Sequence, residues 1–89
     1  MIKVTKKNVD NFLVIVDEGN SKTEHNVELD DECCQNLTSG KMTKEELIKK
    51  SFDFLLKKEA KESILSGFNL KVIKRYFPEY ERVIKEGMA

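Results

Sequence analysis

The chain has 89 residues, of which 39% are hydrophobic and 36% are charged, the composition of one folded domain with a single modest core. Sixteen basic residues balance sixteen acidic ones, so there is no global charge that would attract nucleic acid or a membrane surface. No apolar run approaches the roughly 20 residues of a membrane-spanning helix, and the N-terminus lacks an apolar signal core, so we expect one cytoplasmic domain over residues 1–89 with no membrane contact.

Residues 1–29 have the pattern of β-strands. Ile2–Thr5 and Thr23–Leu29 alternate in side-chain character, as strands with one buried face do. Phe12–Val16 is apolar at every position, which is typical of a central strand. Turn-forming residues separate the three segments, so the sequence predicts a three-stranded antiparallel β-meander with Phe12–Val16 in the middle.

The central strand is apolar on both of its faces. Phe12, Val14 and Val16 face opposite to Leu13 and Ile15, because successive side chains of a strand alternate. Either helices wrap both faces of the sheet, or a partner protein or a second copy of the chain covers one of them. The five residues are therefore candidate interface residues.

Residues 30–86 predict three to four helices, so the fold class is α+β. Asp30 or Asp31 can cap a short helix that extends to about Leu37. The main helix spans Thr43–Lys58, where Thr43 and a glutamate three residues later form a capping box. This amphipathic helix has the largest apolar surface in the chain, so we expect the other elements to pack around it.

The C-terminal third has three weaker helical patterns. A short piece, Glu62–Ser66, ends at a glycine, and a helix over Leu70–Phe77 follows. Pro78 is expected to open a last helix, Pro78–Glu86, because proline breaks a helix interior. Its predicted buried face is Tyr80, Val83 and Ile84, and residues 87–89 are expected to fray.

The sequence has no catalytic, metal or cofactor pattern. Cys33 and Cys34 are adjacent, which is the wrong spacing for a redox pair or a zinc site and favours packing as small apolar residues. His25 is the only histidine and shares its strand face with apolar residues, which favours a structural role over pH sensing or catalysis. We therefore expect a protein that is not an enzyme.

A basic face is predicted on the Leu70–Phe77 helix. Lys71, Lys74 and Arg75 cover one side of this helix, and no acidic residue lies among them. Such a face can bind phosphate or nucleic acid, but a plain solvated surface is the better explanation of three cations on a neutral protein.

Two segments resemble a family of small uncharacterised prokaryotic proteins. They are SFDFLLKKEAKESIL (Ser51–Leu65) and VIKRYFPEYE (Val72–Glu81), and HNVEL (His25–Leu29) precedes them. The resemblance implies a single-domain architecture and no assigned activity. Where these relatives have proline after the glutamate of the linker, this chain has Ala60, which affects the expected break near Glu59.

The functional hypothesis is a non-enzymatic module that binds a partner protein or a second copy of itself. It rests on the two apolar faces of Phe12–Val16. The alternative is weak nucleic-acid binding through Lys71, Lys74 and Arg75.

Overall fold

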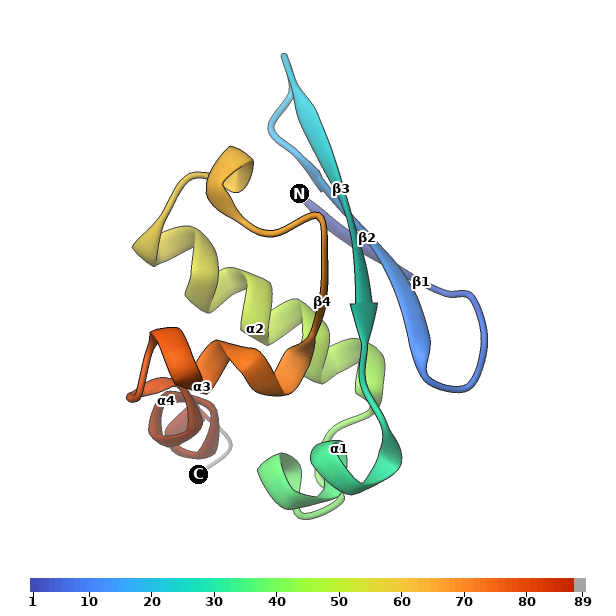
Figure 1. Cartoon of the computed structure of the whole chain (residues 1–89), viewed down its shortest axis with the longest axis vertical. Helices are drawn as coiled ribbons and strands as arrows, with labels where there is room; N and C mark the ends of the chain where they lie inside the picture. The colour runs from blue at the N-terminus through green and yellow to red at the C-terminus, as the bar shows by residue number, and fades with distance from the viewer. Residues whose placement is uncertain (88–89) are drawn as a thin grey trace.

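The fold is a mixed four-stranded sheet with helices on one side (Figure 1), and the computed structural model describes residues 1–87. Its strands, in sheet order, are β1 (Ile2–Lys6), β2 (Asn11–Asp17), β3 (Lys22–Glu28) and β4 (Gly67–Asn69). Its helices are α1 (Asp31–Thr38), α2 (Lys44–Lys58), α3 (Ile73–Tyr76) and α4 (Tyr80–Gly87). The α+β class and the antiparallel β1–β2–β3 meander are confirmed, whereas β4, which pairs in parallel with β3, was not predicted.

The two predicted helix caps are present. Thr43 Oγ1 accepts a hydrogen bond from the Glu46 amide at 3.1 Å, and the Glu46 carboxylate accepts one from the Thr43 amide at 3.0 Å. The Asp30 carboxylate accepts from the Cys33 amide at 2.8 Å and starts α1. Caps of this kind each stabilise a helix by about 1 kcal/mol, which explains why short local patterns located both helix starts.

The C-terminal third differs from the prediction. The expected helix Glu62–Ser66 is a 3₁₀ turn at Lys61–Ser63, and the chain then extends into β4. The expected helix Leu70–Phe77 is a 3₁₀ turn at Leu70–Val72 followed by the single turn α3.

The last helix also begins later than predicted. Phe77, which precedes Pro78, has an extended conformation (φ −131°, ψ 89°), as the ring of a following proline favours. Consequently α4 begins at Tyr80, and Gly87 is its last residue rather than part of a frayed end. The rest of the expected frayed tail, residues 88–89, lies outside the described residues.

One face of the sheet forms the core. Phe12, Val14 and Val16 are at most 1% exposed and lie in one cluster with the buried residues of α2. These three predicted interface residues are therefore core residues, and a partner could reach them only if the helices left the sheet.

Within residues 1–87 no helix covers the other face of the sheet (Figure 1), so the helices described do not wrap both sides. Leu13 and Ile15 lie on this face and are half-buried. Lys3 and Glu24 flank Ile15 across the sheet. Leu13 lies between Thr5 and Asn26, and Lys7 Nζ donates to Asn26 Oδ1 at 3.1 Å from the β1 side of the sheet. Polar neighbours thus interrupt the apolar surface that the sequence suggested.

Candidate functional site

An apolar groove lies between the C-terminal end of α2, β4 and α3. It has a volume of about 380 Å³, and its apolar walls are Leu55, Ile64, Phe68, Val72, Ile73 and Phe77. We call it the Leu65–Tyr76 groove after the two exposed large apolar residues that line it. The side chains of Leu65 and Tyr76 are 52% and 68% exposed, although both are large and apolar. Exposed apolar residues that gather at a hollow are typical of binding sites.

The groove arises where α2 ends. Glu59 adopts an extended conformation (φ −154°, ψ 162°), and the chain turns through Lys61–Ser63 before it returns along β3 as β4. In this returning segment Ile64 points into the core and Leu65 points outward, as neighbouring side chains of an extended chain do. The turn therefore leaves Leu65 exposed opposite α3.

Lys61 anchors this turn to the sheet. Its side chain is buried, and its Nζ lies 2.8 Å from Glu18 Oε1 in the β2–β3 loop and 2.6 Å from Glu62 Oε2. The two carboxylates raise the pKa of Lys61 above its ordinary value of 10.5, chiefly through hydrogen bonds. A charged lysine thus connects the turn that precedes Ile64 and Leu65 to the β2–β3 hairpin.

His25 holds the backbone of Leu65. The ring is 2% exposed, and its Nδ1 lies 2.8 Å from the Leu65 carbonyl oxygen. Because a carbonyl only accepts, Nδ1 donates to it, and Nε2 forms a hydrogen bond with the Thr23 hydroxyl at 2.8 Å. The ring also packs on Phe52, with 5.3 Å between centroids. His25 is therefore a positioning residue for the groove, in line with the structural role that the sequence favoured.

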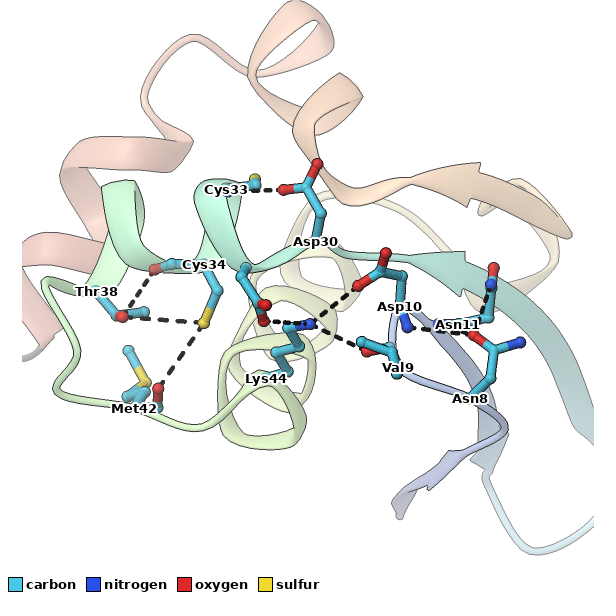
Figure 2. A network of polar contacts seen from close by, with 11 residues as sticks. Asn8, Val9, Asp10, Asn11, Asp30, Cys33, Cys34, Thr38, Met42 and Lys44 are labelled. Carbon is cyan, nitrogen blue, oxygen red and sulfur yellow. Dashed lines mark hydrogen bonds and ion pairs between the residues drawn. The ribbon is translucent and has the colours of Figure 1, made fainter.

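The two cysteines are free and lie away from the groove, in α1. Cys34 is buried, and its sulfur lies 3.8 Å from the Met42 carbonyl oxygen (Figure 2). Cys33 is half-buried, and desolvation, helped by the nearby Asp30 carboxylate, raises the pKa of its thiol above 9.0. A raised pKa leaves less reactive thiolate near neutral pH, which fits a packing role.

Nearby acidic residues partly offset the positive charge of the predicted basic face. Lys71 and Lys74 line a second cavity of about 180 Å³, and three acidic residues line it with them: Asp30, Glu32 and Glu81. Arg75 is exposed and is not among the residues that line this cavity. The acids come from α1 and α4 rather than from the helix itself, so the order of residues along the chain did not reveal them.

A polar network around Lys44 joins the N-terminal ends of α1 and α2 to the β1–β2 loop (Figure 2). Lys44 Nζ lies 2.7 Å from Asp31 Oδ1, 3.1 Å from Asp10 Oδ1 and 3.0 Å from the Val9 carbonyl oxygen. The hydrogen bond to Lys44 lowers the pKa of Asp31 below 3.8, and its partners raise the pKa of Lys44 above 10.5. Because these contacts hold three segments of the fold together, we assign the network a structural role.

We expect the protein to lose stability in acid. The carboxyl groups of Asp31, Glu46 and Glu62 have folded-state pKa values below the ordinary 3.8 and 4.5. Their stabilisation is therefore present above these ordinary values and is lost as the pH falls through the lower folded-state values. The Tm measured by circular dichroism should stay constant down to about pH 5 and decrease below about pH 4.

The matched variant for this prediction is Lys44→Met. It removes the partner of Asp31, so it should lower the Tm slightly near neutral pH and make the decrease in acid shallower. A wild-type Tm that stays flat through the acid range, or a variant with the same acid slope, would contradict the assignment.

No family model, curated protein or solved structure matches this chain. Within residues 1–87, no three or more His, Cys, Asp or Glu side chains gather in a way that could hold a metal ion. In the same part of the chain, no helix is both long enough and apolar enough to cross a membrane.

Sequence reasoning missed the groove. Tyr76 was expected inside the Leu70–Phe77 helix, but it is the last residue of the one-turn α3 and is exposed. Leu65 was expected inside a helical piece, and it lies instead in the extended chain before β4. The available signal was the number of large apolar residues between Ile64 and Phe77, which is high for so short a segment.

Proposed function

We propose that this protein is a non-enzymatic interaction module that binds a segment of a partner protein in the Leu65–Tyr76 groove. The observation that carries the proposal is the apolar hollow of about 380 Å³, which two exposed large side chains border. This volume is at the lower end of the roughly 300–1,000 Å³ range of ligand pockets, which suits one or two inserted side chains. Fully burying a side chain such as leucine contributes about 1.5–3 kcal/mol, so groove contacts alone support a weak and reversible complex.

The groove suits this role better than the open face of the sheet does. On that face Leu13 and Ile15 are half-buried and lie between charged and polar neighbours. In the groove the apolar walls are continuous across three elements of the fold. A partner side chain that packs against these apolar residues displaces water from apolar surface.

The acids that face Lys71 and Lys74 weigh against the alternative of nucleic-acid binding, because they offset the charge that phosphates would neutralise. A nucleic-acid titration at low salt tests this alternative directly. Binding that weakens with salt and disappears after charge reversal of Lys71, Lys74 and Arg75 would replace the present proposal.

We expect a peptide with one exposed apolar pair to bind the groove. The probe is a capped neutral peptide, SGSFLSGS, titrated into the isotope-labelled protein while heteronuclear NMR follows each amide. Shifts should concentrate at Leu65, Phe68 and Tyr76, and Leu65→Ser or Tyr76→Ser should weaken binding by about fivefold or more, since each removes about 1 kcal/mol or more of apolar contact.

The matched control is Val9→Ser. Val9 is 63% exposed in the β1–β2 loop and does not line the groove, so its replacement should leave binding unchanged. Shifts that map to Leu13 and Ile15 would instead place the interaction on the open sheet face. No shift at the groove at any peptide concentration would overturn the proposal.

A further inference from the structure

We infer that the groove selects a partner segment in which a large apolar side chain lies next to a lysine or arginine, and that Glu59 selects the basic residue. The inference rests on the proposed function and adds the chemistry of the partner to it. The basis is the negative charge at the groove, because apolar walls alone would not favour a basic partner segment over an acidic one.

Glu59 is the only charged residue that lines the groove in the described part of the chain. It is half-buried at the C-cap of α2. Within residues 1–87 its carboxylate makes no hydrogen bond or ion pair. A carboxylate held at the edge of an apolar hollow, with no cation of its own, attracts a cation more strongly than one that is already paired.

Lys58 and Lys61, two of the three lysines nearest to Glu59 along the chain, are already engaged. Lys58 Nζ lies 3.1 Å from Glu79 Oε2 and 5.4 Å from the centre of the Phe54 ring. Lys61 is bound by Glu18 and Glu62. These two lysines are thus held by other acids, and within residues 1–87 Lys57 makes no ion pair with Glu59, which leaves Glu59 available to a cation from a partner.

The end of α2 strengthens this preference. The last carbonyl groups of a helix carry a partial negative charge, and Glu59 adds a full negative charge at the same place. The lining aromatic rings of Phe68, Tyr76 and Phe77 can pack against the alkyl stem of a lysine or the plane of an arginine. An acidic partner segment would meet the same carboxylate and be repelled.

The test compares three capped peptides that differ only beside the apolar pair: SGKFLKGS, SGSFLSGS and SGEFLEGS. At low salt the basic peptide should bind the wild-type groove about two- to fivefold more tightly than the neutral one, as expected for one partly exposed ion pair. The acidic peptide should bind most weakly, and added salt should reduce all three differences.

Glu59→Gln should remove the preference for the basic peptide while the neutral peptide still binds. The control is Glu86→Gln on the exposed end of α4, which changes the net charge equally and lies outside the groove. Equal affinity of all three peptides for the wild-type groove would overturn the inference and leave the proposed function standing. Equal effects of the two variants would also overturn it, because they would show a long-range charge effect. If no peptide shifts the groove amides, the proposed function fails first.

Discussion

Replacing Phe52 by alanine is expected to reduce the free energy of unfolding by about 3–5 kcal/mol, the range for removing a buried aromatic side chain. Phe52 is 0% exposed, and its ring lies 5.3 Å from His25 in β3 and 6.1 Å from Phe68 in β4. It therefore joins α2 to both strands of the parallel pair. A domain of this size has about 4–13 kcal/mol of stability in total, so this one change should remove a large share of it.

Urea unfolding followed by circular dichroism measures the effect. Phe52→Leu is the matched variant, since it keeps a branched apolar side chain in the same place and should cost clearly less than alanine. Because Phe68 lines the groove, Phe52→Ala should also weaken binding of the neutral peptide under conditions where the variant is still folded. A loss below about 1 kcal/mol would contradict the central position assigned to this ring.

The elements that the sequence predicted well are those with local signals. The antiparallel meander follows from alternating side chains and short turns, and the apolar run Phe12–Val16 correctly marked the middle strand. The start of α2 follows from two side chains three residues apart, and both of their hydrogen bonds are present. In each case, residues that are neighbours in sequence decide the structure.

The fourth strand had no such signal. Gly67–Asn69 has three residues, and two of them, glycine and asparagine, are poor strand formers. Its partner strand is distant, as the hydrogen bond from Asn69 Nδ2 to Glu28 Oε1 joins residues 41 positions apart. Parallel pairing of this kind depends on tertiary packing, here of Phe68 against Phe52, which a local pattern cannot reveal.

The groove depends on the same long-range event. Once β4 pairs with β3, Leu65 lies just before the strand, where the His25 ring holds its carbonyl group. After β4 and the turn Leu70–Val72, α3 has a single turn that ends before the extended Phe77, and Tyr76 at its end is exposed. The candidate site was therefore hidden because Leu65 takes its position from the unpredicted strand and Tyr76 from a helix that is shorter than the sequence predicted.

Tyr80 is expected to make the protein sensitive to alkali. Burial raises the pKa of Tyr80 above its ordinary value of 10.0. Because Ser51 Oγ donates to the Leu47 carbonyl oxygen, the Tyr80 hydroxyl donates to Ser51. The unfolded chain can lose the phenol proton near pH 10 while the folded chain retains it. The free energy of unfolding should therefore fall by about 1.4 kcal/mol per pH unit above about pH 10.

Tyr80→Phe separates this effect from general alkaline unfolding. Near neutral pH the variant should lose about 1 kcal/mol with the hydrogen bond, but it should lose less stability than the wild type as the pH rises, so the two stability curves should converge or cross. A shallower decrease should remain in the variant, because Cys33, Lys44 and Lys61 also have raised pKa values that weaken the folded state in alkali. The control is Tyr76→Phe, which changes a 68% exposed ring and should leave the alkaline slope unchanged. Equal alkaline slopes for wild type and Tyr80→Phe would show that α4 does not keep this phenol buried.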